Sequence, residues 1–144
     1  MILNTRHVGL VVEDIKKSIK FYQALGLTVW KRQIESGGFI STVVGIDNVE
    51  IETAKLKVSD QFIIELLEYK SHKTKKTAEF YSSNKHGCSH VSFTVENLDD
   101  IAGKIIELGG SIVNLPSITD DGVFKVMYCH DLDGIIIELV EELK

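Results

Sequence analysis

The sequence of 144 residues predicts an α+β protein built from two copies of one βαβββ module. The main observation is a repeat, because residues 7–15 recur as residues 90–98, at an offset of 83 residues. The same offset relates Leu25-Gly26 to Leu108-Gly109, and a third match, at an offset of 73, relates residues 64–68 to residues 137–141. A register kept through several elements indicates an internal duplication, in which the first copy carries ten additional residues.

Each copy opens with an apolar strand that leads into an amphipathic helix. Alternating side chains in segment 8–12 predict the strand. Asp14 and Asn97 stand where a helix N-cap belongs, because a side-chain oxygen there can accept the free amide protons of the first turn. Apolar residues three to four positions apart predict the helix, which ends at Gly26 in the first copy and at Gly109 in the second.

The remainder of each copy reads as strands and turns. The predicted strands are residues 28–35, 39–44, 51–56 and 62–68, a short additional piece near residues 45–52, and residues 112–115, 123–129 and 135–140. Gly37-Gly38 and Asp131–Gly134 are the predicted turns. We expect modules at residues 1–69 and 86–144, forming one compact unit. The polar segment 70–85 between them reads as a solvated linker, or as a patch that meets an anionic group of a substrate.

Composition excludes several classes of function. The chain has 16 Lys+Arg against 21 Asp+Glu, a formal charge of −5, which argues against a nucleic-acid or anionic-membrane partner. No apolar run is long enough to span a bilayer, and the first residues lack a signal-peptide pattern. Cys88 and Cys129 form no C-x-x-C motif and are too few for a disulfide framework or a thiolate zinc site, so we expect reduced thiols in a cytoplasmic protein.

Two carboxylates occupy equivalent positions within apolar strands. Glu65 has Ile63 and Leu67 on its face of the strand, and Glu138 is flanked in the same way. A buried carboxylate costs several kcal/mol unless a positive group lies beside it, and no Lys or Arg is close in the sequence. The repeat therefore places a costly group twice, which suggests that each glutamate has a partner elsewhere in the fold.

Two histidines are matched by the same repeat. His7 and His90 begin equivalent strands, and a small residue, Gly9 or Ser92, follows two positions later on the same face. If the modules form one curved sheet around a cleft, His7, Glu65, His90 and Glu138 converge. Such a mixed set suits a divalent ion: zinc, nickel, cobalt, manganese or iron(II). The structural alternative is that the glutamates pair with distant Lys or Arg and that the histidines are hydrogen-bonded core residues.

These motifs resemble those of the vicinal oxygen chelate superfamily, which includes glyoxalase I, methylmalonyl-CoA epimerase, extradiol dioxygenases and bleomycin-resistance proteins. The resemblance rests on the segments 7–14, 64–68, 90–95 and 131–139, together with Phe21-Tyr22 and Leu25-Gly26-Leu27. It implies paired βαβββ modules, a metal held by His7, Glu65, His90 and Glu138, and a homodimer. Val11 and Tyr69 depart from bacterial glutathione-using lyases, and Glu65 departs from the epimerase, which usually has Gln there.

The resemblance favours a divalent-metal-dependent lyase or isomerase of glyoxalase type. Such an enzyme moves a proton next to the carbonyl of a small-molecule carbonyl or thioester substrate, while the metal holds the enediolate. We expect Glu138 to be the catalytic base, with Glu65 as the second candidate. A non-catalytic binding or resistance protein and an iron(II) dioxygenase remain as alternatives.

Overall fold

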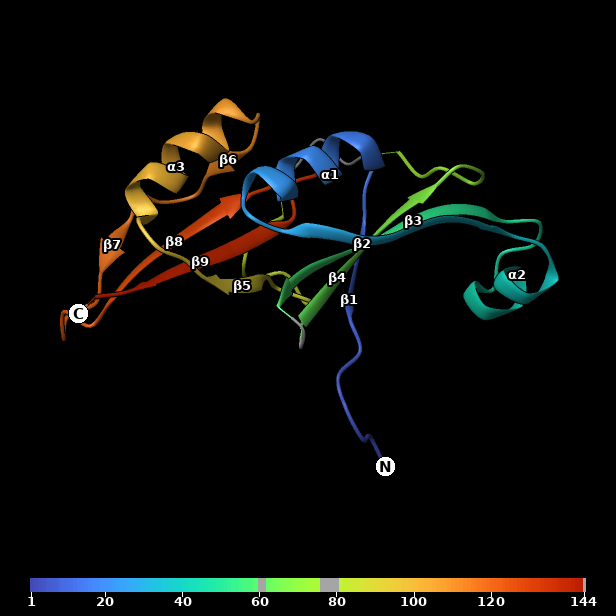
Figure 1. The fold of residues 1–144 in the computed structure, drawn as a ribbon, viewed down its shortest axis with the longest axis horizontal. Coiled ribbons are helices and arrows are strands. Elements are labelled where there is room, and N and C mark those ends of the chain that lie inside the picture. Colours follow the sequence, from blue (N-terminus) through green and yellow to red (C-terminus); the bar gives the residue numbers. More distant parts are fainter. Residues whose placement is uncertain (60–61, 76–80, 144) are drawn as a thin grey trace. The chain divides into compact units, whose positions relative to one another are not determined.

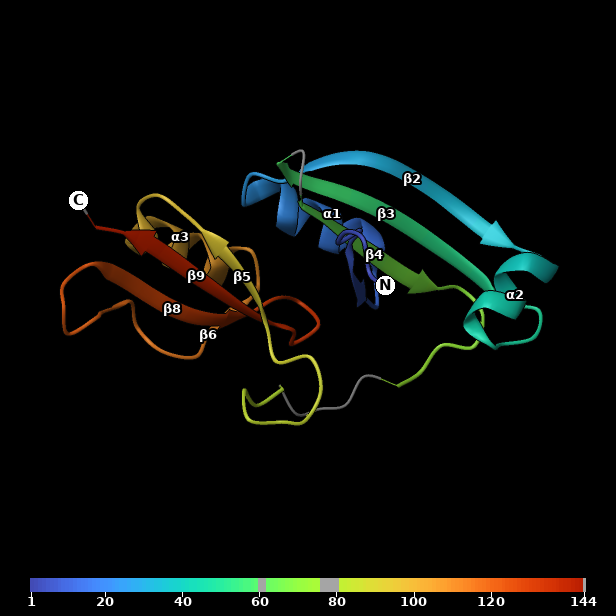
Figure 2. The same ribbon diagram turned by 90° about the horizontal axis from the view of Figure 1, so that it is seen from below.

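A computed structural model describes residues 1–59, 62–75 and 81–143. The chain divides into two compact units, Met1–Lys76 and Thr77–Lys144, and each is described by itself. Both combine a mostly antiparallel sheet with a helix on one face (Figure 1 and Figure 2). The α+β class predicted from the repeat is thereby confirmed, whereas the module bounds at residues 69 and 86 stay a prediction. None of the helices in the described residues is long and apolar enough to cross a membrane.

The first unit holds a four-stranded sheet in the order β1-β4-β3-β2. Strand β1 is parallel to β4, and the other pairs are antiparallel. Helix α1 packs on β2, β3 and β4, so the apolar side chains of these elements form the core. The elements in chain order are β1 (Val8–Val11), α1 (Ile15–Ala24), β2 (Thr28–Ser36), α2 (Gly38–Val44), β3 (Glu50–Ser59) and β4 (Phe62–Tyr69).

The second unit repeats this plan. Its sheet has the order β5-β9-β8-β6, β7 pairs with β8, and α3 packs on β6, β8 and β9. Strand β5 is parallel to β9, just as β1 is parallel to β4. The elements are β5 (Val91–Thr94), α3 (Leu98–Glu107), β6 (Ser111–Ile112), β7 (Ser117–Ile118), β8 (Phe124–His130) and β9 (Ile136–Glu142). Strand β7 was not expected from the sequence, and β6 is shorter than predicted.

One predicted strand is wrong, because residues 39–44 lie in helix α2. Gly37 turns the chain with a φ of 94°, and Gly45 ends the helix with a φ of 70°. No residue of α2 is buried, so its apolar and β-branched side chains do not pack into the core as those of a sheet strand would. The predicted strand piece near residues 45–52 does not form separately, since β3 begins at Glu50. Helix α2 lies where the first copy carries its ten additional residues.

The predicted N-caps differ in outcome. Asp14 accepts the backbone N–H groups of Lys16 and Lys17 at 3.0 and 3.1 Å, as expected. Asn97 makes no cap hydrogen bond, because its backbone is left-handed and its side chain contacts Asp100. A distant carboxylate replaces it: Glu141 on β9 accepts the N–H groups of Asn97 and Leu98 at 3.1 and 3.0 Å. The sheet therefore supplies the cap of α3.

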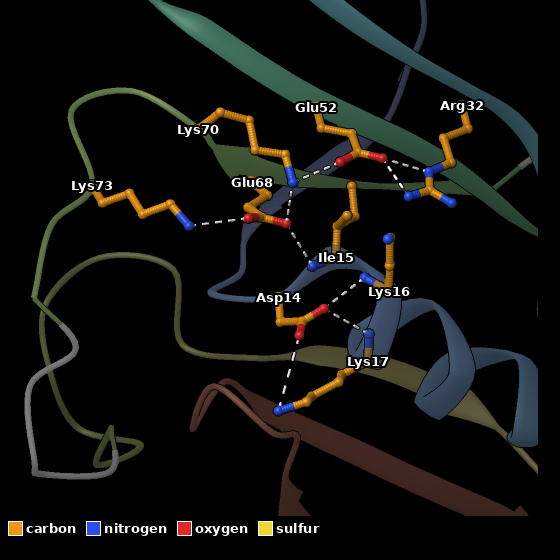
Figure 3. A network of polar contacts seen from close by, with 9 residues as sticks. All are labelled: Asp14, Ile15, Lys16, Lys17, Arg32, Glu52, Glu68, Lys70 and Lys73. Carbon is orange, nitrogen blue, oxygen red and sulfur yellow. Dashed lines mark hydrogen bonds and ion pairs between the residues drawn. The ribbon is translucent and has the colours of Figure 1, made fainter.

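Glu68 does the same for the first unit, within the charged network that Figure 3 shows. It lies on β4 and accepts the N–H of Ile15 at 3.0 Å. Its carboxylate also pairs with Lys70 at 2.8 Å and with Lys73 at 3.2 Å. Burial alone would raise the pKa of Glu68, but these hydrogen bonds outweigh it and lower the pKa to about 2. The carboxylate therefore joins β4, the start of α1 and the segment after β4.

Lys70 extends this network to a second buried carboxylate, Glu52 on β3. The Lys70 ammonium lies 2.7 Å from Glu52, whose other oxygen accepts the Arg32 Nε at 2.6 Å. Hydrogen bonds with Glu52 and Glu68 raise the pKa of Lys70, and the contacts of Glu52 with Lys70 and Arg32 lower the pKa of Glu52. The sequence placed Lys70 at the start of a solvated linker. For this residue that expectation is wrong, because two buried carboxylates require a cation.

Two glycines in the second unit should respond oppositely to replacement by alanine. A Cβ at Gly110 would lie 2.7 Å from the His130 carbonyl oxygen and 2.9 Å from Ile105 Cγ2, whereas a Cβ at Gly103, within α3, would meet nothing within 4 Å. We expect Gly110→Ala to destabilise the protein by roughly 1–3 kcal/mol through overpacking. Gly103→Ala should stabilise it by about 0.5–1 kcal/mol through helix propensity. Urea unfolding followed by circular dichroism tests both, and equal effects would contradict the described packing.

Candidate functional site

The first candidate pair joins His7 to Glu65 within the first unit. His7 stands directly before β1, and its Nε2 lies 2.9 Å from Glu65 Oε2 on β4. The parallel register places Gly9 beside Glu65, so no side chain competes for this space. The His7 side chain is 32% exposed and the Glu65 side chain 13%, so the pair is accessible from solvent on one side. The first unit therefore brings together the imidazole and the carboxylate that the repeat singles out.

The second unit forms the same pair at the equivalent positions. His90 stands directly before β5, and its Nε2 lies 3.2 Å from Glu138 Oε2 on β9. Ser92 is the register partner of Glu138, in the place that Gly9 takes beside Glu65. The same two atoms meet in both units, with similar side-chain exposures of 29% for His90 and 23% for Glu138. The duplication therefore extends to the contact geometry of the candidate residues.

Each pair lies on the sheet face that the helix leaves uncovered. Ile64 and Leu66, the neighbours of Glu65 along β4, are fully buried, and the contacts of α1 include this strand. Glu65 points the other way and is only partly buried, as is Glu138. The two carboxylates, with side-chain exposures of 13% and 23%, are thus largely but not completely buried. The free-energy cost of placing them in these strands is correspondingly smaller.

Glu65 also has a cation that the sequence did not reveal. Lys55 on β3 is its direct register partner, and the Lys55 Nζ lies 3.4 Å from Glu65 Oε1. No Lys or Arg is close to Glu65 in the sequence, but the pairing of β3 with β4 places Lys55, ten residues earlier in the chain, beside it. Glu65 therefore pairs with a basic side chain that is distant in the sequence, as the structural alternative expected.

The equivalent position in the second unit holds Tyr128. Tyr128 is the register partner of Glu138, its hydroxyl lies 3.5 Å from His90 Nδ1, and the two rings lie 5.0 Å apart. Burial, with the nearby charge of Glu138 as a smaller cause, raises the pKa of Tyr128. Ser89 Oγ lies 3.0 Å from the same His90 nitrogen. A neutral hydroxyl group thus replaces the ammonium group of the first unit.

The described residues place the four candidates as two pairs. His7 with Glu65 belongs to one unit and His90 with Glu138 to the other. Across residues 1–59, 62–75 and 81–143, no group of three or more His, Cys, Asp or Glu side chains is arranged to hold a metal ion. The joint site of all four residues stays a prediction, as does the cleft around it.

The other histidines and the two cysteines belong to neither His–Glu pair. His72 and His86 are exposed. His130 is buried, with Ser111 Oγ 3.3 Å from its Nδ1 and the Tyr81 carbonyl oxygen 3.0 Å from its Nε2. Both cysteines are free thiols, and burial raises the pKa of Cys129 to about 12, so this thiol stays protonated at neutral pH.

The fold and the repeated motifs place the chain in a family. It belongs to the Glyoxalase/Bleomycin resistance protein/Dioxygenase superfamily, whose family model matches residues 5–139. A probable lactoylglutathione lyase from Synechocystis sp. is 29% identical over 137 residues, which cover 94% of this chain and 92% of that protein. The resemblance inferred from the sequence motifs is thereby confirmed at the level of the superfamily.

Solved structures agree with this assignment. The crystal structure of a glyoxalase family protein from Bacillus cereus has a TM-score of 0.91 and 26% identity, and it covers 100% of this chain and 97% of that one. Glyoxalase I from Zea mays has a TM-score of 0.67 at 19% identity, and the match covers 97% of this chain but 47% of the maize chain. The maize likeness shows the fold alone.

Proposed function

We propose that this protein is a divalent-metal-dependent lyase or isomerase of glyoxalase type, which moves a proton next to the carbonyl of a small-molecule substrate. One observation carries the proposal: the Nε2 of a histidine meets the Oε2 of a glutamate in both units, at positions related by the duplication. A relative named as a probable lactoylglutathione lyase supports the same class of reaction. We further propose a cytoplasmic homodimer.

The chemistry of the two pairs fits a metal ion. Two imidazoles and two carboxylates form a mixed nitrogen and oxygen set for zinc, nickel, cobalt, manganese or iron(II). His90 Nδ1 has Ser89 Oγ within 3.0 Å, so a proton held on Nδ1 would leave the Nε2 lone pair for the ion. The four residues would act together from one chain or from two chains of a dimer.

In the proposed reaction Glu138 is the base. It takes a proton from the carbon next to the substrate carbonyl and returns it to the substrate, so that no proton is gained or lost overall. A bound divalent ion would stabilise the negative charge that develops on the carbonyl oxygen. Glu65 is the second candidate, but Lys55 contacts its Oε1, whereas in the described chain only His90 pairs with the carboxylate of Glu138.

Metal analysis tests the proposal directly. We expect protein stripped with a chelator to bind one divalent ion at the proposed site, because the two imidazoles and two carboxylates supply its ligands. His7→Ala and His90→Ala should lose this binding, and His86→Ala, an exposed histidine of the second unit, is the control. Turnover is then assayed with hemithioacetals and acyl-CoA thioesters. Wild-type protein that retains no stoichiometric metal after reloading would overturn the proposal.

The same experiment separates the alternatives. A ligand that binds tightly and is released unchanged would indicate a binding or resistance protein. Oxygen uptake with a catechol, seen only after loading with iron(II), would indicate a dioxygenase. A product formed from a hemithioacetal or a thioester without oxygen uptake is the result that the proposal requires.

A further inference from the structure

The two His–Glu pairs differ in the group that lies beside the carboxylate. In the first unit this group is the Lys55 ammonium, 3.4 Å from Glu65 Oε1, and in the second unit it is the neutral side chain of Tyr128. Lys55 and Tyr128 hold the same register position, since each lies opposite the glutamate of its pair on the adjacent antiparallel strand. The duplication therefore keeps the pair in both units but places a positive charge beside only one of them.

Both oxygens of the Glu65 carboxylate have a partner in the first unit. His7 Nε2 lies 2.9 Å from Oε2, and the Lys55 Nζ lies 3.4 Å from Oε1. The Lys55 side chain is 25% exposed and the Glu65 side chain 13%, so solvent screens their attraction only in part. In the second unit His90 contacts Glu138 Oε2, and within the described residues no Lys or Arg forms an ion pair with this carboxylate.

The Lys55 ammonium acts against a divalent ion in two ways. An ion that binds Glu65 meets the ammonium at the same carboxylate, and the two positive charges repel each other. In the protein without an ion, the ammonium stabilises Glu65, because a largely buried carboxylate needs a positive partner. Both effects reduce the free energy gained when the ion binds. Groups just outside the ligands of a metal ion commonly change its affinity by about 10- to 100-fold.

We infer that Lys55 is a built-in counter-cation of Glu65, which holds this carboxylate in the metal-free protein and lowers the affinity of the proposed site for its divalent ion. The inference rests on the proposed function, which makes Glu65 a ligand of that ion. Lys55 acts through Glu65 and does not contact the ion, so it is a positioning residue. The equivalent Tyr128 has no such effect on Glu138, because it carries no positive charge.

Zinc titration of charge variants tests this inference without turnover. Chelator-treated protein is titrated with zinc chloride in competition with a coloured chelator, at about 0.15 M salt, so that distant charges are screened. We expect Lys55→Met to lower the Kd for zinc by about 10- to 100-fold. Lys55→Gln, a second neutral variant, should behave in the same way. Lys55→Arg keeps the charge and should restore a Kd within about threefold of the wild-type value.

Lys31→Met is the matched control, because it removes the same charge from the same face of the sheet. Lys31 lies opposite Lys55 on β2 and is exposed, so solvent screens its charge. We expect the zinc Kd of this variant to differ from the wild-type value by less than about threefold. Equal falls in Kd for Lys31→Met and Lys55→Met would show that net charge sets the affinity, which would overturn the inference.

A double-mutant cycle measures the contact in the metal-free protein. The effects of Lys55→Met and Glu65→Gln on urea unfolding should be non-additive in chelator-treated protein, because each substitution removes the partner of the other. Zinc should raise the unfolding midpoint more in Lys55→Met than in wild type, since the ion binds that variant more tightly. Additive effects in the cycle would contradict the role of Lys55 in the metal-free protein.

The zinc titration distinguishes failure of the inference from failure of the proposed function. A wild-type protein that binds stoichiometric zinc with the same Kd as Lys55→Met, or more tightly, overturns the inference alone. A wild-type protein and a Lys55→Met variant that both bind no stoichiometric ion overturn the proposed function, and the inference with it. Zinc binding that is tighter in Lys55→Met and Lys55→Gln, and unchanged in Lys31→Met, is the result that the inference requires.

Discussion

Replacing Glu138 with Gln should lower kcat by 100- to 10,000-fold on a substrate that the wild-type protein turns over, because a general base contributes about this factor. The amide has nearly the same shape but cannot accept the proton. Glu138 lies opposite the neutral Tyr128, and in the described chain only His90 pairs with its carboxylate, so no ammonium group restrains it. Steady-state kinetics are measured at a saturating metal concentration, so that a lower kcat reports loss of the base and not loss of the bound ion.

Two further variants complete this experiment. Glu142→Gln removes the same charge from the exposed end of β9 and should leave kcat unchanged. Glu65→Gln should lower kcat less than Glu138→Gln does, because Lys55 contacts Glu65 and restrains its movement. A fully metal-loaded Glu138→Gln protein with wild-type kcat would exclude Glu138 as the base. A larger loss in Glu65→Gln would assign that role to Glu65 instead.

Replacing Glu68 with Gln should destabilise the first unit by about 3 kcal/mol at pH 7. The pKa of Glu68 is about 2 in the folded protein, against an ordinary value of 4.5, and each unit of difference corresponds to about 1.4 kcal/mol. The Gln side chain lacks the charge that pairs with Lys70 and Lys73. Urea unfolding followed by Trp30 fluorescence measures the change, because this tryptophan lies in the first unit.

The pH dependence of this effect has a definite sign. Because folding lowers the pKa of Glu68, its contribution is fully present above pH 4.5 and is lost as the pH falls toward 2. The wild-type protein should therefore lose stability across this window more steeply than Glu68→Gln does. Glu50→Gln, an exposed residue at the start of β3, is the control and should change stability by less than about 0.5 kcal/mol. Parallel pH profiles for wild type and Glu68→Gln would contradict the assigned ion pairs.

Local signals in the sequence predicted much of the fold. The apolar periodicity and the capping residue Asp14 located α1, and the repeat located α3 and the strands β1, β4, β5 and β9. Residues 39–44 were assigned wrongly, because a short apolar run fits a strand or a helix equally well until its packing is known. Asn97 has the side chain of a cap residue, but the carboxylate of Glu141 replaces it across the sheet.

The candidate site was predictable only where the repeat exposed it. His7, Glu65, His90 and Glu138 were found as matched positions, and the structure pairs them two by two. Lys55 was missed because its contact with Glu65 depends on the antiparallel register of β3 and β4, which composition does not specify. The same holds for Lys70, whose place after β4 suggested a solvated linker although two carboxylates bind it.

The carboxylates that cap the helices have a consequence for synthesis on the ribosome. Glu68 and Glu141 are each carried by the last strand of their unit, whereas the helices they cap come near its beginning. A nascent chain cannot complete the amino end of α1 until β4 has left the exit tunnel. Each unit should therefore complete its folding in one late step, after its last strand has been synthesised. A fragment ending at Ser59, which lacks β4, should remain sensitive to proteases along α1.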